Sequence, residues 1–174
     1  MIARPTPNDY HSAYERYVAR VPETDVLAAF EHQVDEVRSA LGGVPPAREG
    51  YRYAPDKWTV RQLLGHVIDA ERVFGFRLLS VARGESASLP GFDENAYAAT
   101  ATRETSRLAD LVDEFVAVRR AHVPLLRGLD DAAWTRVGTA NGNRIAARAL
   151  PYLMIGHVRH HLGVLASKYG IPAA

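Results

Sequence analysis

Apolar residues recur every three or four positions along most of the chain, which is the period of a helix that buries one face. Four stretches keep this pattern long enough to predict long helices, at about 24–42, 59–83, 104–127 and 145–169. In the second stretch the apolar stripe is made by Val60, Leu63, Val67, Ala70, Phe74, Leu78 and Val81. The pattern therefore indicates a predominantly helical protein.

Residues at the ends of these stretches are typical helix signals. Thr24 and Thr59 can each accept a hydrogen bond from a free N–H of the following turn. Gly84 and Gly170 can take the left-handed conformation that often ends a helix. Pro151 lies inside the fourth stretch, where its missing N–H predicts either a kink or a later start.

The connections predict how the helices are arranged. Regular alternation of apolar and polar residues is nearly absent, so we expect no sheet. The longest connection, Glu85–Arg103, joins the second and third helices, and a connection of that length is usually functional or a crossover. A crossover lets the two helices that it joins run parallel. We therefore predict an all-α four-helix bundle with a long crossover between the second and third helices.

Composition narrows the class of protein. The chain has 174 residues, enough for one domain with its own core, and we predict that 1–174 is a single domain. The net charge is +1, which gives no electrostatic reason to expect nucleic acid or an anionic membrane as a partner. No apolar run approaches the roughly 20 residues of a membrane span. The segment Met1–Tyr10 lacks the apolar core of a signal peptide, so we expect a cytoplasmic protein.

Histidines are the leading candidates for chemistry, because the chain has no cysteine. His157 and His161 are four residues apart on the apolar stripe of the fourth helix, so both imidazoles can reach one ion. Taken alone, this pair could equally well be two histidines in the core or on the surface that bind no ion. His66 lies next to the apolar stripe of the second helix, and bundle metal sites use inward side chains from facing helices. We therefore predict one divalent metal ion bound by His66, His157 and His161.

Other residues are weaker candidates. Asp69 and Glu71 follow His66 closely, and either carboxylate could orient a ligand imidazole, although solvated charges are commoner on helices. His160 flanks the ligand pair, and Tyr97 in the long connection is either a proton donor or a loop anchor. His122 is on the stripe of the third helix, where a hydrogen-bonded core histidine is more common than a ligand.

One face of the fourth helix is lined with small groups and predicts a close helix contact, either within the chain or with a partner chain. Its residues are Leu153, Gly156, His160, Gly163 and Ser167.

Several motifs together resemble the DinB-like, or damage-inducible protein, superfamily of metal-binding four-helix bundles. They are YRYAPDKWTVRQLLGHVIDAERVF at 51–74, LPGFDENAY at 89–97, TANGNRIAARAL at 139–150 and GHVRHHLGVL at 156–165. The resemblance runs from Tyr10 to Tyr169 and implies an up-down-down-up bundle, usually a homodimer, with a three-histidine metal site.

Residue by residue, the resemblance matches the family's first ligand to His66 and its pair to His157 and His161. His122 falls where relatives often carry a residue that is not a ligand, and Pro151 departs from the family pattern.

The resemblance also suggests the class of activity. Some relatives are thiol transferases that use bacillithiol, mycothiol or glutathione, and others are described as metal-dependent hydrolases. A zinc site with three histidines suits both, because the ion can stabilise a thiolate or lower the pKa of bound water. We therefore expect a metal-dependent transferase that joins a low-molecular-weight thiol to a small electrophile, in stress or detoxification. The alternatives are a hydrolase and a metal-binding stress protein without turnover. Three imidazoles suit Zn²⁺ and Ni²⁺.

Overall fold

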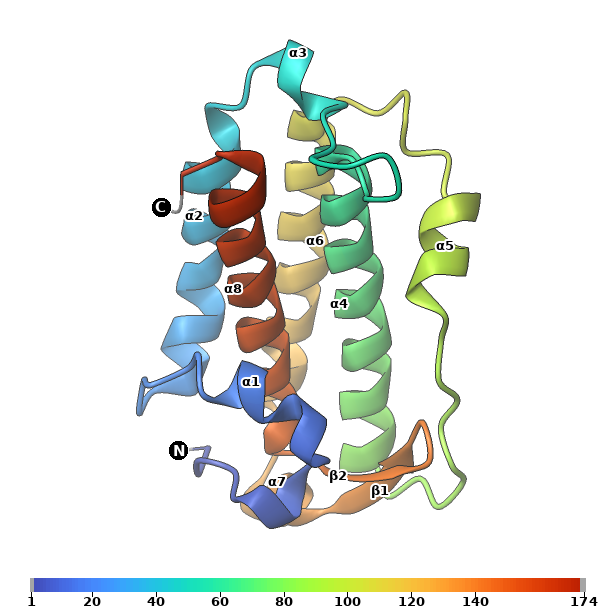
Figure 1. Cartoon of the computed structure of the whole chain (residues 1–174). Helices are drawn as coiled ribbons and strands as arrows, with labels where there is room; N and C mark the ends of the chain where they lie inside the picture. The colour runs from blue at the N-terminus through green and yellow to red at the C-terminus, as the bar shows by residue number, and fades with distance from the viewer. Residues whose placement is uncertain (1, 173–174) are drawn as a thin grey trace.

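Four long helices form the body of the protein in this computed structural model, which describes residues 2–172. They are α2 (Val26–Gly42), α4 (Val60–Ala82), α6 (Leu108–Arg127) and α8 (Ala149–Tyr169). In Figure 1, α2 and α8 run upward and α4 and α6 run downward. The predicted bundle with an up-down-down-up arrangement is therefore confirmed, with α4 and α6 parallel.

The crossover between α4 and α6 follows the outside of the bundle. It contains the short helix α5 (Glu94–Thr100), which packs against α4 (Figure 1). The other short helices are α1 (Glu15–Val18), α3 (Pro46–Glu49) and α7 (Asp131–Thr135), preceded by 3₁₀ turns η1 (Pro7–Asp9) and η2 (Ser12–Tyr14).

The start of α4 shows how the sequence defines a helix end. The Thr59 hydroxyl accepts from the backbone N–H of Gln62 at 3.1 Å, and the side-chain oxygen Oε1 of Gln62 accepts from the backbone N–H of Thr59 at 2.9 Å. This reciprocal capping satisfies two N–H groups that the helix itself leaves free. At the other end, Gly84 adopts φ +83°, the left-handed conformation predicted for it. The position of His66, in the second turn of α4, is fixed by this well-defined start.

Three helices begin two to four residues later than the predicted ranges, within the margin of about two to four residues that such boundaries carry. The residue that caps α2 is Asp25, not Thr24. Helix α6 begins at Leu108, four residues late, because the Glu49 carboxylate from α3 accepts a hydrogen bond from the Leu108 N–H at 3.1 Å. Helix α8 also begins four residues late, at Ala149, which places Pro151 in the first turn, where an N–H has no partner within the helix.

The prediction that the chain has no sheet is wrong. Strands β1 (Val137–Ala140) and β2 (Asn143–Ala146) form an antiparallel hairpin just before α8. Asn141 and Gly142 make its turn with φ +52° and +72°, as a two-residue turn with left-handed residues requires. The strands are only four residues long, too short for alternation to be visible, and the Asn-Gly pair was their one clear signal.

The bundle interior is mostly apolar and contains a buried ion pair. The largest fully buried side chains include Phe30, Phe115 and Tyr152. Arg119 of α6 is completely buried, with its Nε 2.7 Å from Oε1 of Glu71 on α4 and its Cζ 4.0 Å from the Phe30 ring centre. This pair ties the middle of α4 to α6.

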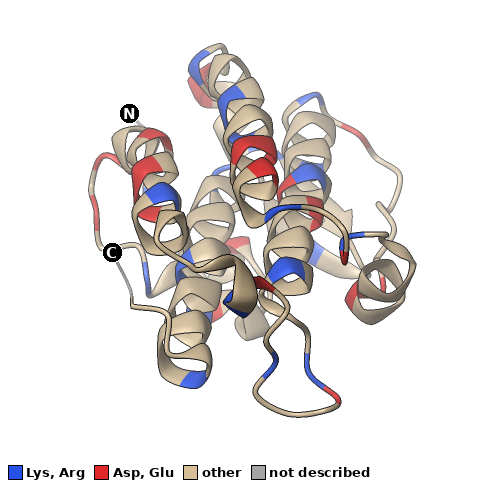
Figure 2. Ribbon diagram, turned by 90° about the horizontal axis from the view of Figure 1, so that it is seen from above, with Lys and Arg blue, Asp and Glu red and all other residues tan. Residues whose placement is uncertain are grey.

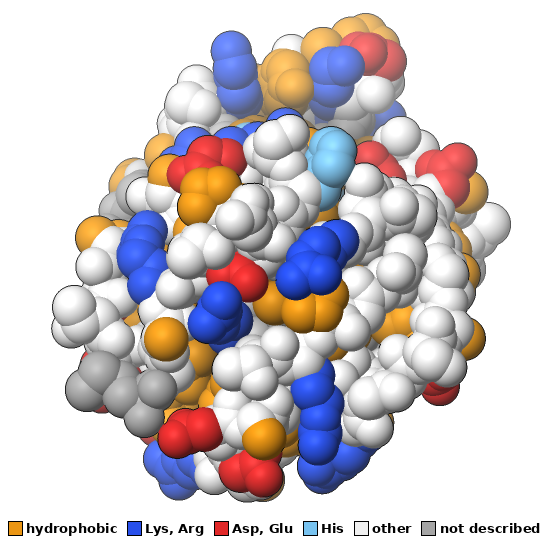
Figure 3. Space-filling view, turned by 90° about the horizontal axis from the view of Figure 1, so that it is seen from below, with side chains coloured by type: hydrophobic (Ala, Val, Ile, Leu, Met, Phe, Trp, Pro, Cys, Tyr) orange, Lys and Arg blue, Asp and Glu red, His pale blue; other side chains and the backbone are white. Residues whose placement is uncertain are grey.

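The charged residues on the outside are mixed in sign. Figure 2 shows acidic and basic positions interspersed on the long helices, and Figure 3 shows both signs and apolar side chains mingled on the lower end. None of the helices within residues 2–172 has the length and apolar composition to cross a bilayer.

Candidate metal centre

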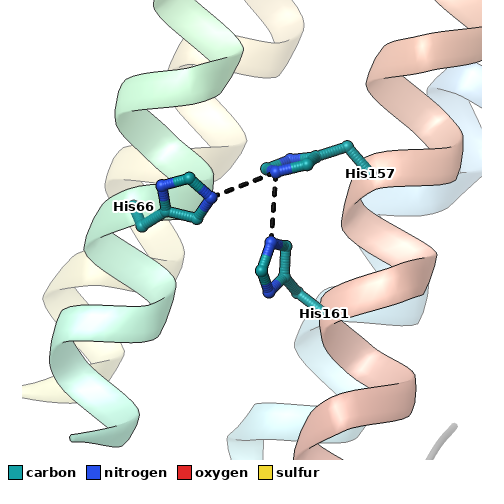
Figure 4. Close-up of side chains that lie close together, drawn as sticks. All are labelled: His66, His157 and His161. Carbon is teal, nitrogen blue, oxygen red and sulfur yellow. Dashed lines mark hydrogen bonds between the residues drawn. The ribbon is translucent and has the colours of Figure 1, made fainter. Parts of the chain in front are cut away.

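Three histidines from two facing helices converge in the upper half of the bundle. His66 comes from α4, while His157 and His161 lie one turn apart on α8, and all three rings point toward one another in Figure 4. The Nε2 atom of His157 lies 3.1 Å from Nε2 of His66 and 3.1 Å from Nε2 of His161. One nitrogen from each ring can be chosen so that all lie within 4.8 Å of one another. The structure thus brings together the three residues that the sequence singled out.

Hydrogen bonding alone does not account for this cluster. A neutral imidazole nitrogen carries either a proton or a lone pair, so Nε2 of His157 can make one ordinary hydrogen bond, yet it has two close Nε2 neighbours. Ligand atoms of a tetrahedral ion, at roughly 2.0–2.1 Å from it, are about 3.3–3.4 Å apart, close to the two separations of 3.1 Å that involve His157. Three lone pairs directed at one divalent ion therefore fit the arrangement better than a chain of hydrogen bonds.

Burial keeps these imidazoles neutral. It lowers the pKa of His66 to about 4, the first cause being loss of solvent. It lowers the pKa of His161 to about 3, with the neighbouring His66 adding to the effect. The pKa of His157 falls well below its ordinary 6.5, because the ring is buried and lies beside His161 and His66. All three rings therefore hold lone pairs at neutral pH, as metal ligation requires.

Aromatic rings from three elements surround the histidines. Trp58, just before the cap of α4, lies with its ring centre 4.8 Å from that of His66. Tyr17 of α1 and Phe74 of α4 approach His157 edge-on, at 5.4 and 5.8 Å between ring centres. These rings pack against the imidazoles and restrict their rotation.

The histidines and these aromatic rings line a cavity of about 320 Å³. Side chains of α1, α4, α5 and α8, of Trp58 before α4, of the crossover and of the hairpin turn line it. All three segments that join the long helices therefore contribute to the site. Besides the three histidines, the polar and aromatic lining residues are Tyr14, Arg16, Tyr17, Trp58, Phe74, Arg77, Phe92, Glu94, Asn141 and His160. A small molecule in this cavity would contact the histidine cluster directly.

The carboxylates predicted to orient the ligands bind arginines instead. Asp69 lies 3.1 Å from an Nη of Arg103, and Glu71 pairs with Arg119 in the core. The Nδ1 atom of His161 is buried without a hydrogen-bond partner among residues 2–172. Support of the imidazoles by these two carboxylates is therefore not made in this structure.

The remaining predicted residues have distinct places. His160 lines the cavity and stacks edge-on against Tyr17, with ring centres 5.5 Å apart, but it is outside the three-nitrogen cluster. Tyr97 is exposed on α5, and its ring centre lies 5.3 Å from that of Phe92. Phe92 lines the cavity, whereas Tyr97 packs behind it. His122 is half-buried, and its Nδ1 lies 3.3 Å from Oε1 of Glu71, in agreement with a hydrogen-bonded core role.

Sequence reasoning missed several residues of the cavity wall. Arg77 lies 11 positions after His66 on α4, which is three helical turns and thus the same face. That spacing was a usable signal. Tyr17, Arg16 and Asn141 come from distant segments, and their presence depends on how α1 and the hairpin pack against the bundle, which no local pattern reveals.

Comparison with solved structures supports the fold. YfiT from Bacillus subtilis, described as "a probable metal-dependent hydrolase with an unusual four-helix bundle topology", superposes with a TM-score of 0.75 at 17% identity. The match covers 98% of this chain and 95% of that one. A mycothiol-dependent maleylpyruvate isomerase superposes with a TM-score of 0.63 at 19% identity, over 90% of this chain and 64% of that longer chain. At these identities the likeness shows the fold alone.

Comparison by sequence shows the family. No curated protein matches the chain. The sequence model of the DinB superfamily matches residues 29–165, which include the three clustered histidines and all but the ends of the bundle. Together with the confirmed bundle topology, this match means that the chain belongs to the DinB superfamily.

Proposed function

We propose that this protein is a metal-dependent enzyme that transfers a low-molecular-weight thiol to a small electrophile. The observation that carries the proposal is the cluster of three neutral imidazoles, with Nε2 of His157 3.1 Å from Nε2 of both His66 and His161, at the wall of a cavity of about 320 Å³. His66, His157 and His161 would hold one divalent ion, with Zn²⁺ or Ni²⁺ as the candidates. Three protein ligands leave a position for a substrate atom, as in catalytic sites.

The bound ion would hold a thiol as its thiolate near neutral pH, which makes the sulfur nucleophilic. The protein's own residues would do the rest. Trp58, Phe74 and Tyr17 pack against the histidines and form an aromatic part of the cavity wall, and the cavity gives the electrophile room beside the sulfur. The chain has no cysteine of its own to supply the thiol. The proposed source is a small cosubstrate, and the family resemblance makes bacillithiol, mycothiol and glutathione the candidates.

Two solved relatives define the alternatives. One is described as mycothiol-dependent, which favours thiol chemistry, and the other as a probable metal-dependent hydrolase, which favours activation of water at the same site. A third possibility is a metal-binding stress protein without turnover. A homodimer and a cytoplasmic location stay predictions, the first testable by sedimentation at micromolar concentration.

The experiment compares the three candidate thiols on protein loaded with Zn²⁺ or Ni²⁺. Each thiol is mixed with monochlorobimane, and the fluorescent thioether is followed in wild type, chelator-treated protein and His66→Ala. The proposal predicts a rate above background with at least one thiol, lost on chelation and in the variant. Metal-dependent hydrolysis of an ester or amide panel without any thioether formation would replace it with the hydrolase. No turnover in either assay would leave a metal-binding protein.

A further inference from the structure

Arg77 is a buried cation in the wall of the histidine cavity. Its exposed fraction is 4%, and it follows His66 by three turns on the same face of α4, about 16 Å along the helix axis. Its Cζ lies 5.8 Å from the ring centre of Phe74, and that ring lies 5.8 Å from the ring centre of His157. Arg77 and the histidine cluster are thus two polar features of one cavity, with Phe74 in contact with both.

The guanidinium of Arg77 has no anionic partner. Among residues 2–172 no carboxylate lies within 4.0 Å of it, and its hydrogen bond goes from Nη2 to the Pro90 carbonyl oxygen at 3.0 Å. The Nε atom is buried and makes no hydrogen bond within the described part of the chain. An isolated buried charge costs several kcal/mol, so proteins normally pair it.

Arg119 shows that another buried arginine of this chain is paired with a carboxylate. It is the other arginine in the buried set, and its guanidinium pairs with the equally buried carboxylate of Glu71 at 2.7 Å. A purely structural Arg77 should have acquired a similar partner. Arg77 instead lines a cavity that can admit an external anion.

The rest of the lining agrees with an anionic ligand. Arg16 also borders the cavity, where its Nη2 donates to the Tyr17 hydroxyl at 3.1 Å and its Cζ lies 4.8 Å from that ring centre. Glu94, at the start of α5, is the single carboxylate among the lining residues that the structure describes. The cavity therefore has two fixed cations and one carboxylate before any metal ion is counted.

We propose that the substrate of this cavity carries a carboxylate, which the guanidinium of Arg77 binds while the reacting atom lies at the histidine cluster. The planar guanidinium suits a carboxylate, because its parallel N–H groups match the two oxygens. The proposal rests on the proposed function for the reacting end of the ligand. It adds the substrate class: a small carboxylic acid long enough to reach from the histidines to Arg77.

The test uses two-ended probes on zinc-loaded protein. The probes are 3-mercaptopropionate and 6-mercaptohexanoate, each compared by calorimetry with the mercapto-alcohol of the same length. We expect at least one acid to bind roughly 10–100-fold more tightly than its alcohol, the range of a hydrogen-bonded charge pair. The preferred length measures the span from metal to Arg77. Arg77→Met should abolish the preference, and Arg77→Lys should keep only part of it because the fork of donors is lost.

A matched control and a metal-free arm make every outcome decisive. Arg83→Met removes an exposed arginine at the end of the same helix, outside the cavity, and should keep the full preference. In chelator-treated protein, hexanoate should raise the unfolding temperature of wild type more than hexanol does, and should lose this effect in Arg77→Met.

Equal binding of acid and alcohol by a protein that holds one zinc per chain would overturn the carboxylate site and leave the metal site standing. A protein that binds no zinc but shows the Arg77-dependent hexanoate effect would refute the proposed function and keep the carboxylate site. If Arg77→Met only lowers stability and keeps the acid preference, Arg77 merely ties the crossover to α4, and the proposal is wrong.

Discussion

Gly156 of α8 is the place where α1 crosses the bundle closest to the histidine cluster. A Cβ atom built on Gly156 would lie 2.0 Å from the Tyr17 carbonyl oxygen and 2.5 Å from its carbonyl carbon. Both are backbone atoms, so no side-chain rotation can relieve the contact. Gly163 belongs to the same line of small residues on α8, but a Cβ there would meet only an Nη of Arg20, at 3.9 Å. The two glycines therefore allow one substitution to be made in two environments.

We predict opposite effects of Gly→Ala at these two positions. At Gly163 the change removes the flexibility of glycine in a helix and should stabilise the protein by about 0.5–1 kcal/mol. At Gly156 the same gain is outweighed by overpacking, which typically costs about 1–3 kcal/mol and here demands a backbone shift of about 1 Å or more. The two variants should differ by about 2 kcal/mol, equivalent to roughly 4–8 °C in unfolding temperature for a chain of this size.

Urea unfolding followed by circular dichroism measures both free energies of unfolding. Hydrogen exchange of the α1 amides shows whether Gly156→Ala displaces α1 rather than straining α8. Equal stability of the two variants, with unchanged protection of α1, would refute the packing of α1 on Gly156. This packing also accounts for part of the predicted line of small residues, whose close contact at Gly156 is with a helix of this chain.

Two further predictions concern buried polar groups. Glu71→Gln should lower the free energy of unfolding by about 3–5 kcal/mol, because it leaves the Arg119 charge uncompensated in the core. Adding Arg119→Met should restore most of that loss. A double variant as unstable as the single one would contradict this. Burial raises the pKa of Tyr169 to about 12, and its hydroxyl donates to the Trp58 carbonyl oxygen at 2.7 Å. A raised folded-state pKa gives stability that is complete below pH 10 and is lost as the pH rises toward 12. Tyr169→Phe should therefore weaken the fall in stability between pH 9 and 12, and an unchanged slope in urea titrations would contradict the assignment.

The long helices could be predicted because their signals are local. Period, capping residues and terminal glycines all lie within the segment that they define, as Thr59 and Gly84 illustrate at the two ends of α4. The start of α6 could not be predicted, because the carboxylate that accepts from its first N–H comes from Glu49, which is 59 residues away. The hairpin before α8 was missed because its four-residue strands are too short to show a period.

The candidate site divides in the same way. The spacing of His157 and His161, and the inward position of His66, follow from helix geometry and are visible in the sequence. The sequence does not show that arginines compete with the histidines for the nearby carboxylates. Asp69 and Glu71 are close to His66 along α4, but Arg103 and Arg119 bind them, since unpaired guanidinium groups would be costly at those places.

The central claim is that His66, His157 and His161 bind one divalent ion, and a zinc titration of chelator-treated protein tests it most directly. Wild type, His160→Ala and His122→Ala should each bind one equivalent per chain. His66→Ala, His157→Ala and His161→Ala should bind at least 10–100-fold more weakly, since even loss of an outer hydrogen-bond partner of a ligand typically costs that much. Circular dichroism before each titration separates lost ligation from lost folding. Full zinc occupancy in a folded His66→Ala protein, at wild-type affinity, would contradict the three-histidine site.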